Sequence, residues 1–265
     1  MRIHRQLMLC VLIGLVIIFA LIGVYLGVRR ANYLAKYTPL LCRATERGDL
    51  TEVKRLIALG ASPSREEDNG EDYCAPLDIA IACKHFPVVR YLVEHGAGRF
   101  HPSTDDDRLN VAAGIGSPEI LAYLMQRYPD HDKARLLYYA AGGHYAARYD
   151  GGWQIDNVKY LLAHGAQPGI NRAFDGGERA LHVAETPEIA AYLLSHGAQL
   201  AVKDNFSCTP LFGAVASGHL ALVKFYVEKG LDVNAKDSDG KSSLMYANAT
   251  SNPKVIAYLK AHGAK

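Results

Sequence analysis

Few residues in this sequence have the types and spacing that catalysis or metal binding requires. The five cysteines lie far apart, with no C-x-x-C pair and no histidines at zinc-ligand spacing, so we expect neither a zinc site nor a disulfide scaffold: Cys10, Cys42, Cys74, Cys83 and Cys208. The sequence has no G-x-S-x-G, no H-E-x-x-H and no phosphate-binding glycine loop. We therefore predict no catalytic residues, no cofactor and no metal site, and we expect that the chain is not an enzyme.

Two short acidic motifs have residue types that could bind an ion. The DSDG motif at residues 237–240 is similar to a calcium loop, but Ala235 and Tyr246 occupy the first and twelfth ligand positions of that frame. It is better interpreted as a turn. The PDHD motif around His131 offers a single imidazole, which is too little for a stable site. The rival hypothesis of an enzyme or metal protein would need a role for His131 or His144.

Overall charge excludes another class of function. Acidic and basic residues nearly balance, with a formal net charge of +2, and no long run of lysine and arginine is present. Nucleic-acid binding normally requires a basic surface. We therefore expect no nucleic-acid partner, and we look for function in local surfaces.

The N-terminal region contains an uncharged apolar stretch of 22 residues, 7–28. At about 1.5 Å per residue a helix of this length crosses the roughly 30 Å hydrocarbon core of a bilayer. We predict a single-pass membrane protein, with the domain on the exported side weakly favoured because a short basic tail is easily retained. The expected segments are a basic tail at 1–6, a transmembrane signal anchor at 7–28, a linker at 29–37 and a repeat domain at 38–265. Gly23 and Gly27 form a G-x-x-x-G, which leaves assembly through the anchor as a further alternative.

Beyond residue 37 the sequence repeats itself seven times. Each repeat opens with a Leu-x-x-Ala pair, and apolar residues stand seven, four and three positions before a shared glycine, except for Lys260 in the last repeat. These offsets define one face of an α-helix, which the glycine then ends in the left-handed conformation. Each repeat is predicted to be a short helix, a turn, a second helix and an extended loop. The shared position is Gly60, Gly96, Tyr128, Gly165, Gly197, Gly230 and Gly263.

Repeats four and five depart from the common length. In five repeats the opening alanine lies 16 residues before the shared position, but Ala140 lies 25 residues before Gly165 and Ala184 only 13 before Gly197. Both departures fall at the turn between the two helices. The sequence therefore predicts a bulge in repeat four beside a notch in repeat five.

The bulge carries the first candidate binding residues, Tyr145, Arg148, Tyr149 and Trp153. Tryptophan, tyrosine and arginine dominate the energetically important parts of protein interfaces. Alternatively, one of these aromatic side chains folds into the notch and buries its area there. Both interpretations stay open, with at least one aromatic residue favoured as a plug.

Acidic residues supply the second candidate surface. They crowd the loops after the first and second repeats and continue in the next loop with Asp130 and Asp132, and such loops lie side by side in a stack. A negative strip would favour a partner with a basic surface and raise its encounter rate; the alternative is an ordinary solvated loop surface. The candidates are Glu66, Glu67, Asp68, Glu71, Asp72, Asp105, Asp106 and Asp107.

The repeat pattern resembles the ankyrin repeat. The resemblance rests on "TPL" at 209–211, "ALHVA" at 180–184, "SGHLALV" at 217–223 and "GLDVNAKDSDGKSSL" at 230–244, and it covers roughly residues 38–265. It implies an all-α solenoid of seven helix-turn-helix units with β-turn finger loops, here preceded by the predicted transmembrane helix.

The resemblance also implies a function. It predicts a membrane-tethered module that binds a protein partner stoichiometrically through finger loops and the concave face. Analogy with membrane-anchored ankyrin proteins of bacteria predicts a location in the bacterial inner membrane. The same analogy gives two narrower alternatives, an immunity protein that neutralises a secreted toxin and a helper of an envelope enzyme. The sequence leaves the oligomeric state open.

Overall fold

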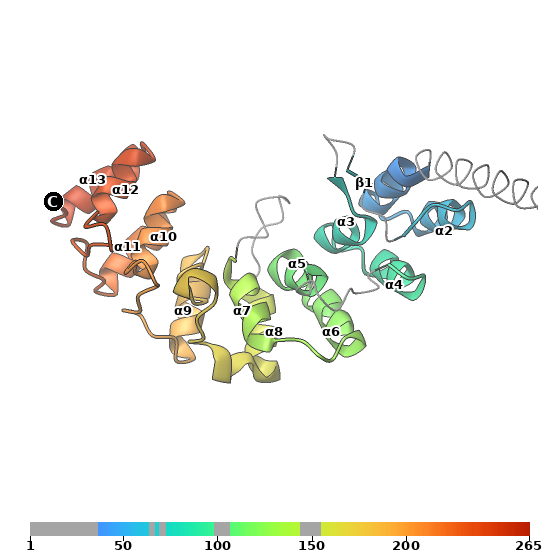
Figure 1. Cartoon of the computed structure of the whole chain (residues 1–265), viewed down its shortest axis with the longest axis horizontal. Helices are drawn as coiled ribbons and strands as arrows, with labels where there is room; N and C mark the ends of the chain where they lie inside the picture. The colour runs from blue at the N-terminus through green and yellow to red at the C-terminus, as the bar shows by residue number, and fades with distance from the viewer. Residues whose placement is uncertain (1–36, 64–66, 69–72, 98–106, 144–154) are drawn as a thin grey trace, which may run out of the picture. The chain divides into compact units, whose positions relative to one another are not determined.

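A computed structural model describes residues 37–63, 67–68, 73–97, 107–143 and 155–265. The chain divides into two compact bodies, one with residues 1–80 and 87–99 and the other with residues 81–86 and 100–265. We call these the N-terminal body and the C-terminal body and describe each by itself. In both, short helices follow one another in pairs along the chain (Figure 1).

The N-terminal body holds one complete helix pair and most of a second. The first pair is a helix at 37–46 and α2 (Leu50–Ala58), and the second is α3 (Pro76–Ala82) and α4 (Phe86–Glu94). Between the pairs, β1 (Glu67–Asp68) and β2 (Tyr73–Cys74) form a two-stranded antiparallel sheet. The second repeat therefore begins directly after a β-finger, as predicted.

The C-terminal body contains the remaining repeats. Its helices alternate between a first and a second member of each pair except in repeat five, which has a single helix, and three short irregular segments lie between the last helix of repeat four and the helix of repeat five. The elements are α5 (Asp107–Ile115), α6 (Pro118–Arg127), α7 (Lys133–Ala141), α8 (Ile155–Leu161), η2 (Leu162–Ala166), η3 (Gln167–Gly169), η4 (Asp175–Gly177), α9 (Pro187–Ser195), α10 (Pro210–Ala216), α11 (Leu220–Glu228), α12 (Ser243–Ala249) and α13 (Pro253–Ala261).

Local sequence sets both ends of the second helices. Ser117, Thr186 and Asn252 each precede a proline at the first helical turn, and each side chain accepts a hydrogen bond from the backbone N–H three residues later. This combination satisfies a free donor and presets the helical φ. At the other end, the six repeated glycines have φ between +87° and +98°, which confirms the predicted left-handed helix ends.

The predicted apolar face forms the core. The position four before the shared glycine is at most 1 % exposed in all seven repeats, and the position seven before it is fully buried in the first six. The position three before it is only half-buried in several repeats, whereas the position eight before it is buried in six. In repeat four that buried position holds a polar residue, Asn157.

Asn157 joins repeat four to repeat three. Its side-chain amide donates to the carbonyl oxygens of Ala113 and Gly116 at 2.9 Å each and to that of Ala112 at 3.2 Å. These carbonyls lie at the C-terminal end of α5, where helices leave acceptors without intrahelical donors. A buried polar side chain thus replaces the usual apolar one because it caps the neighbouring helix.

Repeat five lacks its first helix, so the expectation of two helices in every repeat is wrong here. Eight residues (179–186) separate its finger from α9, whereas eleven (209–219) separate the next finger from α11. Eight residues are too few for a helix and a turn, and residues 180–183 form turns instead. The carbonyl of Leu181 accepts the hydroxyl hydrogen bond of the fully buried Tyr226 at 2.8 Å. Tyr226 stands where the other six repeats have leucine, and its hydroxyl supplies the donor that a continued helix would have given.

The membrane prediction needs correction. Helices in the described residues are at most ten residues long, which is about 15 Å against the roughly 30 Å of a bilayer core. No helix in that part of the chain is long and apolar enough to cross a membrane. The predicted fold class with a preceding transmembrane helix, and the single-pass membrane localisation, are contradicted by this finding. Residues 7–28, and the predicted boundaries at 6, 28 and 37, lie outside the described residues or at their edge.

Candidate protein-binding surface

Three finger turns in the C-terminal body share one geometry. In each, the backbone N–H of the first residue donates to the carbonyl of the fifth, and the N–H of the fourth donates to the carbonyl of the first, at 2.8–3.1 Å. The fourth residue has positive φ: Gly177, Ser207 and Gly240. We call residues 174–178, 204–208 and 237–241 the finger row.

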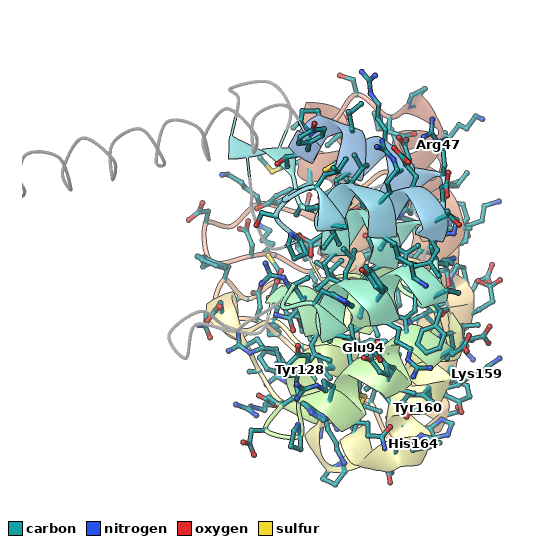
Figure 2. The ribbon with its side chains drawn as sticks, turned by 90° about the vertical axis from the view of Figure 1, so that its right-hand side faces the viewer. Arg47, Glu94, Tyr128, Lys159, Tyr160 and His164 are labelled. Atoms are coloured by element: carbon teal, nitrogen blue, oxygen red, sulfur yellow. The ribbon has the colours of Figure 1, made fainter. Side chains whose placement is uncertain are left out.

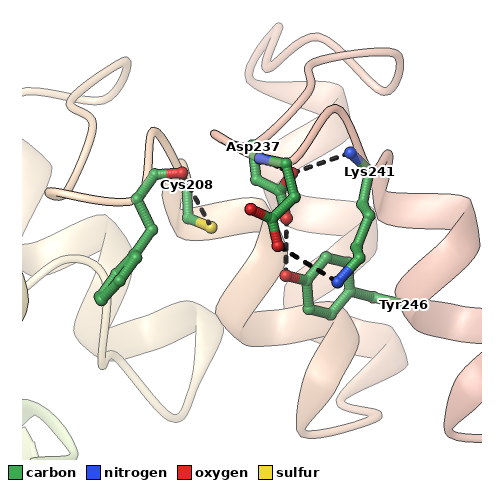
Figure 3. Close-up of polar contacts among 6 residues, drawn as sticks. Cys208, Asp237, Lys241 and Tyr246 are labelled. Carbon is green, nitrogen blue, oxygen red and sulfur yellow. Dashed lines mark hydrogen bonds and ion pairs between the residues drawn. The ribbon is translucent and has the colours of Figure 1, made fainter.

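Aspartates hold two of these turns. The Asp237 carboxylate accepts backbone N–H groups of Asp239 and Lys241 at 2.9 and 2.8 Å, and its second oxygen accepts the hydroxyl of Tyr246 at 2.7 Å (Figure 3). Asp204 receives the corresponding two backbone bonds at 2.8 Å each. The Tyr246 hydroxyl and the two N–H groups lower the pKa of Asp237. The DSDG motif is therefore a finger turn, as predicted.

Backbone hydrogen bonds join the three fingers. Asn205 N–H donates to the carbonyl of Gly176 at 2.9 Å, and Ser238 N–H donates to the carbonyl of Phe206 at 2.8 Å. Both bonds run from the second residue of one finger to the third residue of the preceding finger. Three loops far apart in sequence are therefore held as one surface.

This surface exposes large apolar side chains. Phe206 occupies the third position of the middle finger and is 59 % exposed, and Met245 on the following helix α12 is 53 % exposed. The space that a side chain at Gly176 would take lies 3.7 Å from the Phe206 ring, so the ring lies against the neighbouring finger. Exposed aromatic groups on a rigid support are typical of interfaces, because little conformational entropy is lost on binding.

The finger of repeat five differs from the other two in having an aromatic residue at its first position, Phe174. Its ring packs on that of Tyr138 at 5.1 Å, and the guanidinium groups of Arg135 and Arg172 lie 5.7 and 5.3 Å from its centroid. The Tyr138 hydroxyl donates to the Glu178 carboxylate at 2.6 Å. Burial, followed by that carboxylate, raises the pKa of Tyr138, so the phenol stays protonated and remains a donor.

A cavity of about 120 Å³ lies where repeat five lacks its helix. We call it the notch. Its walls come from the end of α7, from the turns of repeat five and from α10 and α11. The lining residues are Gly142, Glu178, His182, Val183, Ala184, Glu185, Gly213, Ala214, Ser217, His219 and Leu222. The sequence spacing predicted this notch.

Two glycines let the backbone segments around the notch approach closely. A Cβ at Gly142 would lie 1.8 Å from the carbonyl oxygen of Val183, and one at Gly213 would lie 2.8 Å from that of His182. Real Cβ atoms do not approach other heavy atoms that closely. The notch therefore has fixed walls of backbone on both sides.

Among the titratable groups that line the notch, His182 forms hydrogen bonds within the fold, and Glu185 forms an ion pair with His219. His182 accepts the Arg179 N–H through Nδ1, so Nε2 carries the proton and donates to the Cys208 carbonyl, both at 3.2 Å. Burial lowers the pKa of His182. Glu185, with a side chain 21 % exposed, lies 3.1 Å from Nδ1 of the more exposed His219. Burial raises the pKa of Glu185, and His219 opposes this only in part.

Most of the predicted binding residues lie outside the described residues. These are Tyr145, Arg148, Tyr149, Trp153, Glu66, Glu71, Asp72, Asp105 and Asp106. Of the others, Glu67 and Asp68 are adjacent in β1, and Asp107 begins α5 in the other body. The proposed acidic strip and the aromatic contact surface therefore stay predictions.

Histidines that recur with the repeat have a structural role. The rings of Tyr160 and His164 stack at 3.9 Å (Figure 2), and Nδ1 of His164 donates to the Tyr160 carbonyl at 2.7 Å. The same pairing recurs at three other helix ends: Tyr91 with His95, Tyr192 with His196, and Tyr258 with His262.

The cysteines and acids of the described part form no metal site. No group of three histidine, cysteine or acidic side chains there could hold a metal ion. Cys83 and Cys208 are free thiols, and burial raises the pKa of Cys208 to about 11. Cys42 is disulfide-bonded, which the sequence spacing did not indicate.

Comparison with known proteins assigns the C-terminal part of this surface. Residues 186–265 match the family model of ankyrin repeats in three copies. These residues are similar to ankyrin repeats. They include α9 of repeat five, both helices of repeats six and seven, and two of the three turns of the finger row. Ankyrin repeats indicate a module that binds other proteins, and the predicted family is confirmed to that extent.

Similar proteins come from several kinds of organism. Alpha-latrocrustotoxin-Lt1a of Latrodectus tredecimguttatus is 24% identical over 217 residues, which is 75% of this chain and 15% of the toxin. The putative ankyrin repeat protein FPV243 of fowlpox virus is 37% identical over 60 residues, 23% of either chain. The probable 26S proteasome regulatory subunit p28 of Saccharomyces cerevisiae is 30% identical over 99 residues, 36% of this chain and 43% of that protein. The matched segments thus span less than half of each of these relatives.

Proposed function

We propose that this protein binds a protein partner stoichiometrically through the finger row and the helices beside it. The observation that carries the proposal is the exposed Phe206 ring on three loops joined by backbone hydrogen bonds. A partner that covers this ring gains the free energy of burying its apolar area without having to order the loop first. The chemistry of an enzyme has no comparable support among the described side chains.

The acidic loops and the aromatic bulge enter this proposal as additional contacts. Glu67, Asp68 and Asp107 would contribute charge that attracts a basic partner surface, and Trp153 would contribute buried area. Charge reversal at Asp107 together with its two neighbours should then reduce the association rate and its dependence on salt. An unchanged salt dependence would remove the acidic loops from the binding surface.

The test is capture of a partner by the purified full chain, followed by measurement of stoichiometry with the isolated partner. Phe206→Ser should abolish binding without changing the melting temperature, because the ring is exposed and contributes little to the core. Leu59→Ser is the matched control, since Leu59 is 42 % exposed but lies at the end of α2, outside the finger row. Binding that survives Phe206→Ser unchanged would place the contact elsewhere, and loss in both variants would point to general destabilisation.

A further inference from the structure

We infer that the notch binds a cationic side chain, arginine or lysine, that a protein partner inserts beside the finger row. The inference deepens the proposed function, on which it rests, by assigning the chemistry of one partner residue. Glu178 connects the two surfaces, because it closes the finger turn of repeat five and also lines the notch. A partner that covers the finger turn of repeat five therefore lies next to the lining of the notch.

The lining suits the two parts of a long basic side chain. Ala184, Ala214 and Leu222 contribute apolar surface, and Glu185 contributes a carboxylate. Lysine and arginine place a methylene stem against apolar surface while the charged head meets polar groups. The cavity volume of about 120 Å³ is well above the roughly 10–15 Å³ that a cavity needs to hold one water, so the notch has room for more than a single water.

Charge selects a cation over an anion or a neutral group. The Glu185 side chain is largely withdrawn from water, and its ion-pair partner His219 is 45 % exposed and charged only when protonated. His219 therefore balances the negative charge of Glu185 only in part, and desolvation disfavours the ionised form of this carboxylate. A guanidinium or ammonium group in the notch would restore the missing compensation through a charge-assisted hydrogen bond.

The other groups in the notch exclude a metal ion as the occupant. Both ring nitrogens of His182 already have backbone partners, so this histidine has no lone pair to offer. No three potential ligands come together in the described part of the chain. An organic cation needs only acceptors, and the notch provides the Glu185 carboxylate with backbone carbonyls on its walls.

The first experiment uses a blocked arginine, N-acetyl-arginine methylamide, titrated into the full chain while the imidazole signals are followed by NMR. The His219 signal is assigned by its loss in His219→Gln. The wild type should show a saturable shift of this signal, and Glu185→Gln should weaken binding about tenfold or more. Glu188→Gln, which removes an exposed carboxylate three residues away on α9, should bind like the wild type.

A neutral probe separates charge from shape. N-acetyl-citrulline methylamide has nearly the shape of the arginine probe but no charge, and it should cause no saturable shift. Equal binding of the two probes, equal binding by the wild type and Glu185→Gln, or no shift at any concentration would each overturn the proposal. Stronger probe binding by Arg148→Gln than by the wild type would also overturn the proposal, because Arg148 of this chain would then be the occupant of the notch.

The captured partner provides the second arm. Glu185→Gln should weaken partner binding, and replacement of one basic residue of the partner should weaken it to the same extent, with no further loss in the double variant. A partner that depends on Phe206 but not on Glu185 would leave the proposed function standing and remove the notch. Probe binding without any partner that depends on Phe206 would support the notch as a cation site and contradict the proposed function.

Discussion

Replacing Tyr226 by leucine tests how repeat five survives without its first helix. Leucine is the residue of the other six repeats at this position, so a consensus argument expects stabilisation. The structure predicts the reverse. The fully buried hydroxyl donates to the carbonyl of Leu181 at 2.8 Å, and a buried acceptor that loses its donor costs about 1–3 kcal/mol. The void left by the smaller side chain adds about 1 kcal/mol, so Tyr226→Leu should cost about 2–4 kcal/mol.

Urea unfolding of the full chain, followed by circular dichroism, measures this difference. Tyr226→Phe isolates the hydroxyl and should cost about 1–3 kcal/mol. Tyr160→Phe is the control and should stay within about 0.5 kcal/mol, because Tyr160 is only half-buried and interacts through its ring and backbone. If Tyr226→Leu proves as stable as the wild type, the hydroxyl is not what stabilises the turns of repeat five. If only Tyr226→Phe is neutral, packing and not the hydrogen bond explains the effect.

Three further predictions concern other contacts. Asn157→Ala should lower the free energy of unfolding by about 2 kcal/mol, because two buried carbonyls lose their donor, whereas Asn171→Ala at a half-buried site should cost less, as measured by urea unfolding. Gly142→Ala should lower the melting temperature much more than Gly230→Ala, since both have positive φ but only the first lacks space for a Cβ, and equal losses would refute the fixed wall of the notch. The lowered pKa of Asp237 means that its carboxylate stabilises the fold above an ordinary aspartate pKa near 4, with this contribution lost as pH falls through the lowered value. The stability difference between wild type and Asp237→Asn should therefore shrink in acid, and a constant difference from pH 7 to 2 would contradict the assignment.

Much of the fold was predictable because the repeat imposes the same local requirements several times. The glycine after six of the seven second helices, the proline after Ser117, Thr186 and Asn252, and the apolar face all act within a few residues, so the sequence contains their cause. The missing helix of repeat five was only half predicted. Spacing located the shortening, but whether eight residues still form a helix depends on the neighbours that accept or donate its hydrogen bonds.

The binding surface was harder to predict, since its features depend on tertiary contacts. In the sequence Phe206 cannot be distinguished from an aromatic residue of the core, and its exposure becomes evident only in the folded finger. In the sequence Glu185 is one of many acidic residues. In the fold it lies half-buried beside His219, at the place where repeat five lacks its first helix. One signal was available for the notch, the 13-residue spacing of repeat five, but spacing alone says nothing of charge. The acidic and aromatic segments that the sequence predicts as binding surfaces stand out by their composition. Composition indicates neither the exposure of a side chain nor the rigidity of the backbone that carries it.

The reduced repeat five also bears on how the protein folds. In repeat proteins each repeat is stabilised mainly by its immediate neighbours, so cooperativity passes along the chain through successive interfaces. An interface that lacks one helix transmits less of this coupling, and the repeats on its two sides are joined by hydrogen bonds of Tyr226, His182 and the fingers. Repeats six and seven can then open as a separate cooperative block, with amide protons that exchange together and earlier than those of α7 and α8. The shortened repeat would in this way set the border between two folding units within the C-terminal body.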